Sequence, residues 1–217
     1  MDFKHLLEIV GTEPVFETAL LLAGQVNPEI VRLQLTRWVK SGQVYQLRRG
    51  LYALAPPSQK VRPHPFVIAN RLQRASYVSL QSALAFYGLI PDIVQVTLSV
   101  TAGRPKRWET PLGVFEFRRV KPKLLRGYQM MELQDGTKPA QEALVATPEK
   151  ALLDLVYLQS SGDTSDYLGE LRLQNLEQLD IGKLGGLAEV FATPKLRRAI
   201  GTITRLIQSE AQEYETV

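Results

Sequence analysis

Residues 27–55, NPEIVRLQLTRWVKSGQVYQLRRGLYALA, constrain the fold more than any other stretch of this chain. Asn27 followed by Pro28 is typical of a helix start, because an asparagine side chain can cap the helix and its first turn does not need the missing proline N–H. Gly42 marks the end of the helix. Two short β-prone runs then follow and are joined at Arg49-Gly50, which predicts a hairpin.

Helical periodicity gives this helix an apolar side and a basic side. The apolar side carries Ile30, Val31, Leu35, Trp38 and Val39. The remaining arc, about 140° wide, begins with Glu29, is interrupted by Leu33, and carries Arg32, Thr36, Arg37 and Lys40. The hairpin tip adds Arg48 and Arg49. A basic helix leading into a hairpin with a basic tip is typical of a winged helix–turn–helix that binds duplex DNA. The alternative is a structural helical hairpin whose charged face is only solvated.

The residues before this helix fit the same interpretation. Apolar side chains at helical spacing predict a helix over residues 2–10, and a second helical pattern runs from Thr12 to Ala23. Gly24 to Asn27 would form the turn between the two helices of the motif. For residues 1–55 the predicted order is therefore helix, helix, turn, helix, strand, strand.

Prolines separate this region from the rest of the chain. They predict a semi-rigid linker over residues 56–65 and a mixed α/β C-terminal domain over 66–217, so that the whole chain is of the α+β class. The expected elements of the second domain are an early helix, a strand leading to a helix capped by Ser79, several strands and a run of terminal helices. Strands are expected at 93–101, around a hairpin at 111–113, at 124–133 and at 143–146, and helices follow Thr147.

Charge is distributed unevenly along the chain. Residues 29–62 carry a net charge of +6, residues 100–128 also +6, and residues 129–217 −6. Two basic blocks between acidic flanks suggest two surfaces that could meet phosphate. In the second block, a predicted turn carries Arg104, Lys106 and Arg107. Those three residues are interpreted either as a solvated hairpin turn or as a second nucleic-acid contact.

The residues that most enzyme and metal sites need are sparse here. The chain has no Cys and two His, His5 and His64, which lie far apart in the sequence, so neither a zinc site nor any other metal site is expected. No glycine-rich phosphate loop is present. Ser79 and Ser82 have no base nearby in the sequence, and the carboxylates Glu109, Glu116 and Glu149 are not clustered. We therefore expect no catalytic residues, no cofactor and no enzyme activity.

Location follows from what the sequence lacks. The N-terminus is too polar for a signal peptide, and no apolar run approaches the ~20 residues of a membrane span. We expect a cytoplasmic protein without a membrane partner.

Two segments, SYVSLQSALAFYGLIP (76–91) and VATPEKALLDLVYL (145–158), resemble signature segments of the AbiEi family, the antitoxins of bacterial type IV toxin–antitoxin systems. LRRGLYAL and PLGVFEFRRVKP fit that family in order and spacing, and the resemblance covers roughly residues 1–160.

The resemblance implies a winged-helix transcriptional repressor that binds inverted repeats in its own operator, needs no cofactor, and counteracts a nucleotidyltransferase-type toxin without a stable complex. The family's basic DNA-facing positions would correspond to Arg32, Arg37 and Lys40 on the helix and to Arg48 and Arg49 on the ribbon. Self-association on DNA stays open. The alternatives are a nuclease-like enzyme targeted to DNA by a winged helix, and a winged-helix protein-interaction module.

Overall fold

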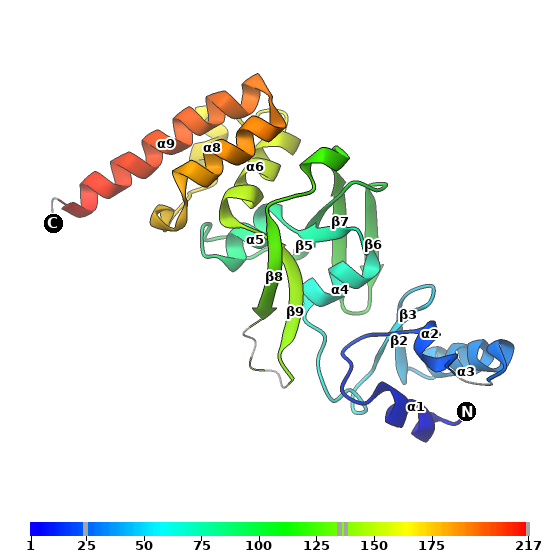
Figure 1. Ribbon diagram of the computed structural model, residues 1–217. Helices are drawn as coiled ribbons and strands as arrows, with labels where there is room; N and C mark the ends of the chain where they lie inside the picture. Colours follow the sequence, from blue (N-terminus) through cyan, green and yellow to red (C-terminus); the bar gives the residue numbers. More distant parts are fainter. Residues whose placement is uncertain (24–25, 134–135, 137–138, 216–217) are drawn as a thin grey trace.

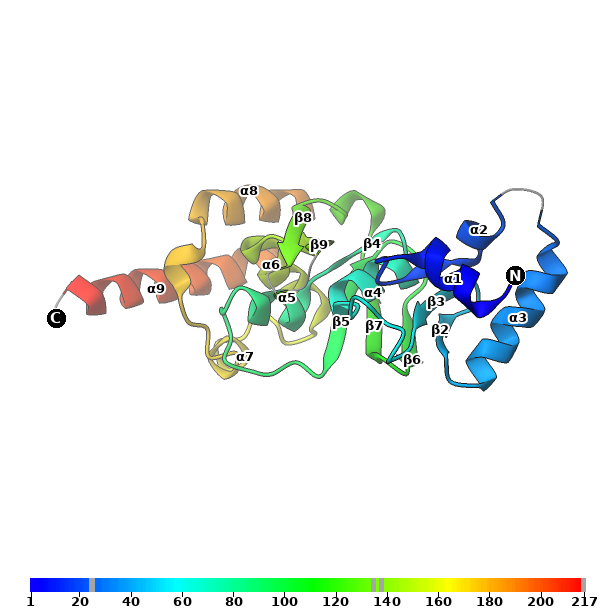
Figure 2. The same ribbon diagram turned by 90° about the horizontal axis from the view of Figure 1, so that it is seen from below.

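The computed structural model describes residues 1–23, 26–133, 136 and 139–215, with side chains up to residue 208. Its elements follow one another along a long axis, with the first and last helices of the described residues near opposite ends (Figure 1). Seen from below, α3 (Pro28–Lys40) forms the outer end of the molecule, far from α9 (Pro194–Glu215) (Figure 2). The described part of the chain is of the α+β class, as predicted.

The N-terminal part combines three helices with a small antiparallel sheet. Its elements are α1 (Phe3–Val10), β1 (Phe16–Glu17), α2 (Thr18–Leu21), α3, β2 (Val44–Arg48) and β3 (Leu51–Leu54), and the strand order is β1-β3-β2. The Asn27 side chain caps α3 as predicted, because its oxygen accepts the backbone N–H of Glu29 at 2.9 Å. The predicted hairpin is also present, and Gly50 at its tip has a φ of +82°, which suits glycine.

The helix predicted between Thr12 and Ala23 is wrong over its first half. Val15 and Phe16 are buried, and Phe16 lies in a short strand paired with Tyr52 of β3. Pro14 helps to explain the difference, because proline lacks an N–H and disfavours a helical conformation in the residue before it. Of the predicted turn, residues 24 and 25 lie outside the described residues.

The C-terminal part is built on a mixed six-stranded sheet with the order β6-β7-β5-β4-β9-β8. Strands β5 and β7 pair in parallel, as do β4 and β9, and the remaining pairs are antiparallel. Lys106 and Arg107, predicted in a turn, belong to strand β6 instead. The strands are β4 (Ser76–Val78), β5 (Val96–Thr101), β6 (Lys106–Thr110), β7 (Gly113–Arg119), β8 (Tyr128–Leu133) and β9 (Gln141–Ala146).

Helices pack around this sheet and extend beyond it. The predicted run of terminal helices is confirmed. Helix α4 contacts β4, β5 and β9, whereas α5 contacts β5 and α6, and α8 and α9 stack on α6. The helices are α4 (Pro65–Leu72), α5 (Leu80–Phe86), α6 (Pro148–Leu158), α7 (Ser165–Glu170), α8 (Ile181–Phe191) and α9, with short 3-10 turns at Pro122–Leu124 and Leu176–Gln178.

Strand β3 joins the two parts, because it is buried on both faces. Tyr52 and Leu54 belong to the apolar core of the N-terminal helices, together with Val31, Leu35 and Trp38. Leu51 and Ala53 point the other way and belong to the core of the larger sheet. Successive side chains of a strand face opposite sides, so one four-residue strand serves two cores. Residues 56–64 of the predicted linker contain neither helix nor strand, whereas Pro65, its last predicted residue, begins α4.

Candidate nucleic-acid interface

The outer face of α3 displays the predicted polar and basic residues to solvent. Arg32, Thr36, Arg37 and Lys40 are all exposed, while Val31, Leu35 and Trp38 are buried against α1 and the small sheet. Among the described residues, none of the cations Arg32, Arg37 and Lys40 forms an ion pair. Thr36 is partly committed, since its hydroxyl donates to the Arg32 carbonyl oxygen at 2.9 Å. Three cations on this face are thus available to an anionic partner.

Two apolar side chains lie on the same face. Ile30, which the sequence pattern placed on the apolar side, is 49% exposed, and Leu33 is 51% exposed. The prediction for Ile30 is therefore wrong, because Val31, Leu35 and Trp38 already fill the space under the helix.

The two arginines of the hairpin tip have different surroundings. Arg49 is exposed and forms no ion pair within the described residues. Arg48 is half-buried, and its guanidinium donates to the carbonyl oxygens of Arg49 at 3.0 Å and Arg71 at 3.3 Å. Arg71 lies in the last turn of α4, where carbonyl groups and the helix dipole favour a cation. Arg48 therefore fastens the hairpin tip to α4, and Arg49 is the arginine that faces solvent.

A second link joins the same two regions. The Arg74 guanidinium donates to both carboxylate oxygens of Glu17, at 2.8 and 2.6 Å, and this hydrogen bonding lowers the pKa of the Glu17 carboxyl. Glu17 ends β1, and the residue after it, Thr18, donates its backbone N–H to the Gly50 carbonyl at the hairpin tip. The tip is thus held from two sides, which favours a fixed orientation relative to the larger sheet.

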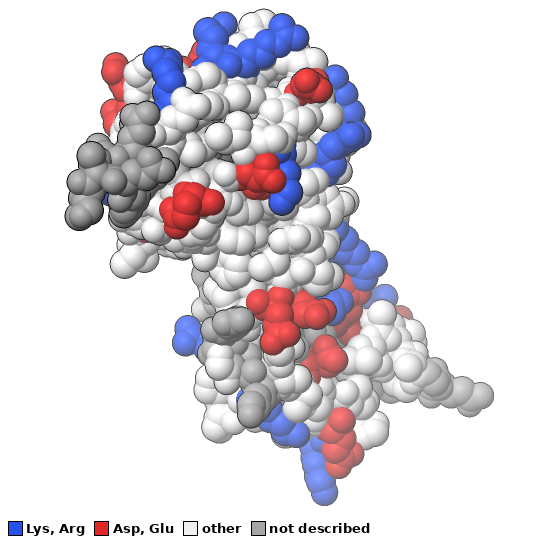
Figure 3. All heavy atoms as spheres, turned by 60° about the vertical axis from the view of Figure 1, so that its left-hand side comes forward, with Lys and Arg blue, Asp and Glu red and all other residues white. Residues whose placement is uncertain are grey.

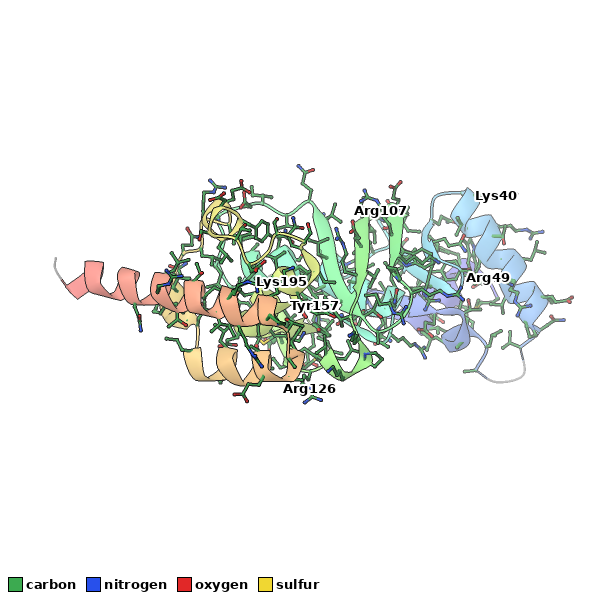
Figure 4. All side chains as sticks on the ribbon, turned by 90° about the horizontal axis from the view of Figure 1, so that it is seen from above. Lys40, Arg49, Arg107, Arg126, Tyr157 and Lys195 are labelled. Carbon is green, nitrogen blue, oxygen red and sulfur yellow. The ribbon has the colours of Figure 1, made fainter. Side chains whose placement is uncertain are left out.

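The structure brings the second basic block next to the hairpin, because β6 packs beside β2. Figure 4 shows Lys40 and Arg49 in the N-terminal part and Arg107 on the neighbouring sheet, whereas Arg126, Tyr157 and Lys195 lie further along the molecule. Arg107 is paired with Glu109 and Glu116, at 3.4 and 3.5 Å.

The other two predicted residues of this block differ from Arg107. The Lys106 ammonium lies 3.7 Å from the centre of the Trp108 ring, and the Arg104 side chain is exposed. The ion pairs of Arg107 partly neutralise the charge of the second basic block. This favours a solvated surface over a primary phosphate-binding site at Arg104, Lys106 and Arg107.

On one face of the molecule, acidic side chains interrupt the basic ones (Figure 3). On the face drawn in Figure 3, Lys and Arg lie mainly along the edges of the molecule, and acidic side chains lie between them. The outer face of α3 combines unpaired cations with an element narrow enough to enter a groove.

A buried polar cluster connects the two segments that carry the family resemblance. Asp154 of α6 accepts hydrogen bonds at one carboxylate oxygen from the Tyr77 and Ser79 hydroxyls, both at 2.9 Å, and its other oxygen pairs with the Lys150 ammonium. Lys150, Asp154 and Ser79 are fully buried, and Tyr77 is 1% exposed. These residues hold β4 and α6 together deep in the core.

Burial sets the protonation behaviour of this cluster. Burial and the neighbouring Asp154 carboxylate raise the pKa of the Tyr77 hydroxyl, which therefore remains a hydrogen-bond donor. Burial also lowers the pKa of the Lys150 ammonium, against the attraction of Asp154. Each charge in the pair thus depends on the other.

Sequence reasoning missed this cluster. It interpreted Ser79 as a helix cap, but the Ser79 side chain makes no capping hydrogen bond and donates to Asp154 instead. A signal was present in the sequence, since Lys150 and Asp154 lie four residues apart among apolar residues of one helix. Leu80, the next residue after Ser79, has a φ of +58°, which is unusual for leucine.

The carboxylates that a nuclease site would need form ion pairs or hydrogen bonds within the fold instead. Glu109 and Glu116 bind Arg107, and buried Glu149 accepts the backbone N–H of Asp180 at 3.1 Å. The described part of the chain holds no group of three or more His, Asp or Glu side chains suited to a metal ion. Within the same residues, no helix has the length and apolar character of a membrane span.

Comparison with known proteins adds no family to these observations. No protein-family model matches the chain, and no curated protein matches it either.

Proposed function

We propose that this protein is a sequence-specific, double-stranded DNA-binding repressor whose N-terminal part acts as a winged helix–turn–helix. The observation that carries the proposal is the outer face of α3, where Arg32, Arg37 and Lys40 are exposed without an ion pair among the described residues. A hairpin directly after α3 supports the proposal, because it places basic residues of a β-ribbon beside the helix that would enter the groove.

In this proposal α3 enters the major groove and the hairpin reaches the neighbouring backbone. Arg32, Thr36 and Arg37 contact base edges, which carry the sequence information, whereas Lys40 and Arg49 bind phosphate. Arg49 directly follows β2, about 17 Å along the chain from the first residue of that strand, Val44. Arg48 supports this arrangement by holding the tip against α4.

The resemblance to the AbiEi family extends the proposal to the second domain. The repressor would bind inverted repeats in its own operator and serve as the antitoxin to a nucleotidyltransferase-type toxin without forming a stable complex with it. Co-expression with the product of the neighbouring gene tests this extension: the antitoxin proposal requires that growth is restored while the two proteins do not co-purify.

DNA binding is tested by fluorescence anisotropy with a duplex taken from the region upstream of the protein's own gene, alongside a scrambled duplex of equal length. The wild type should prefer the upstream duplex, and Arg37→Ala should weaken that binding about 5- to 150-fold, the loss expected for one bidentate base contact. Arg172→Ala is the matched control, because Arg172 is also exposed but pairs with Asp92 far from α3. Equal binding to both duplexes, or equal losses in both variants, would remove α3 from the proposal.

A further inference from the structure

Two exposed apolar side chains of α3 belong to neither apolar core of the described residues. Ile30 and Leu33 are each about half exposed, although the same helix buries Val31, Leu35 and Trp38 almost completely. A solvent-facing helix surface normally carries polar side chains at such positions. Both residues lie in the first two turns of α3, the half from which a recognition helix usually contacts base edges.

Charged residues follow each of these side chains along the helix. Leu33 and Lys40 are seven residues apart, as are Ile30 and Arg37, so each pair lies within about 20° of one line along the helix. The cation of each pair lies about 10 Å further along the axis, a distance comparable to the roughly 12 Å width of the major groove. The face is therefore apolar in its first two turns, where it would meet the groove floor, and Lys40 lies further along, where it would meet the sugar–phosphate backbone.

We propose that Ile30 and Leu33 are specificity residues that contact thymine C5-methyl groups, so that the preferred half-site carries thymine opposite the first two turns of α3. This inference rests on the proposed function. Thymine is the base that presents a methyl group in the major groove, and apolar side chains read it by direct contact. On the same face, Lys40 complements phosphate.

Charge argues against a second copy of this chain as the occupant. A symmetric pairing of two α3 faces would bring Arg32, Arg37 and Lys40 of both copies together, with Glu29 as the one acidic residue on each helix. Like charges brought together in this way disfavour association. A polyanion avoids that conflict.

Deoxyuridine substitution tests the inference, because deoxyuridine differs from thymidine only by the absence of the methyl group. The probe is a duplex that the full-length protein selects from a randomised pool. Each thymine is replaced by deoxyuridine in turn, and affinity is measured for the wild type, Leu33→Ala, Ile30→Ala and Leu20→Ala. Leu20 of α2 is the matched control, since it is 41% exposed but lies on another helix.

The wild type should lose about fourfold in affinity at one or more thymines in each half-site, the factor expected for one buried methyl group. Leu33→Ala or Ile30→Ala should lose that sensitivity at the position concerned, and Leu20→Ala should retain it.

Equal affinity of the wild type for every substituted duplex would overturn the inference while leaving DNA binding in place. A change of molar mass on Leu33→Ala, seen by light scattering, would also overturn it, because the apolar pair would then join two copies. Failure to select any duplex would instead refute the proposed function itself.

Discussion

Replacing Asp154 by asparagine should destabilise the protein strongly, although the two side chains have nearly the same shape. The carboxylate is fully buried and receives hydrogen bonds from Tyr77, Ser79 and Lys150. Removing its charge leaves the Lys150 ammonium buried without a counter-ion. Removing one partner of a buried ion pair typically destabilises a protein by about 3–5 kcal/mol. The alternative is to deprotonate Lys150, and at pH 7 this costs about 1.4 kcal/mol for each of the 3.5 pH units below its ordinary pKa, hence about 5 kcal/mol.

The same reasoning predicts how the deficit of Asp154→Asn varies with pH. Burial already lowers the pKa of Lys150 in the wild type, and removal of the carboxylate takes away the attraction that opposes this. In the variant the folded state then holds Lys150 neutral, while the unfolded state binds a proton below about pH 10. The free energy of unfolding of Asp154→Asn should therefore rise with pH between pH 7 and 9, by about 1.4 kcal/mol per pH unit more than that of the wild type.

Urea unfolding at several pH values, followed by circular dichroism, measures this effect through the transition midpoint. The control is Lys150→Met/Asp154→Asn, which removes both charges and should be less destabilised than Asp154→Asn alone, without the added pH dependence. A deficit below about 1 kcal/mol, the range of solvated surface pairs, or a deficit that does not change with pH, would refute the account of Lys150 and Asp154 as mutually dependent charges.

Three further outcomes are expected. Lys40→Ala and Arg49→Ala should each reduce the log–log salt slope of DNA binding by about 0.9, as loss of one phosphate contact does; an unchanged slope would mean that the residue contacts no phosphate. The Arg74 hydrogen bond lowers the pKa of Glu17, so the stability it adds is present above the ordinary glutamate pKa and lost as pH falls through the lowered value. Arg74→Ala should thus flatten the acid limb of the stability curve in urea titrations between pH 3 and 6, and a limb as steep as that of the wild type would count against the link. Asn27→Ala should cost about 1 kcal/mol through loss of the α3 cap, measured by thermal unfolding, and no change would show that the cap is dispensable.

Local signals in the sequence predicted most of the elements. The Asn27 cap, the glycine at the hairpin tip and the Thr147 cap with Pro148 each act over a few residues, and all three are present in the structure. Strand β1 was missed because its two residues are extended only through pairing with β3, a contact far away in the sequence.

The candidate site was less predictable than the fold. Helical periodicity identified the outer face of α3, but it could not predict that Ile30 would be exposed. The exposure of Ile30 depends on which side chains of α3 the residues of α1 and the small sheet cover. The different surroundings of Arg48 and Arg49 depend on the α4 carboxyl end, 23 residues further along the chain from Arg48. Adjacent identical residues carry no signal in the sequence for such a difference.

The double burial of β3 has a consequence for dissecting the protein. A fragment ending at Ala55 would keep Tyr52 and Leu54 covered but would present Leu51 and Ala53 to water as a flat apolar strip on a sheet. Exposed apolar strips of this kind promote aggregation. The isolated N-terminal part should therefore aggregate instead of folding as a stable domain. Because β3 belongs to both cores, a substitution that loosens the core of the larger sheet should also shift the hairpin and α3.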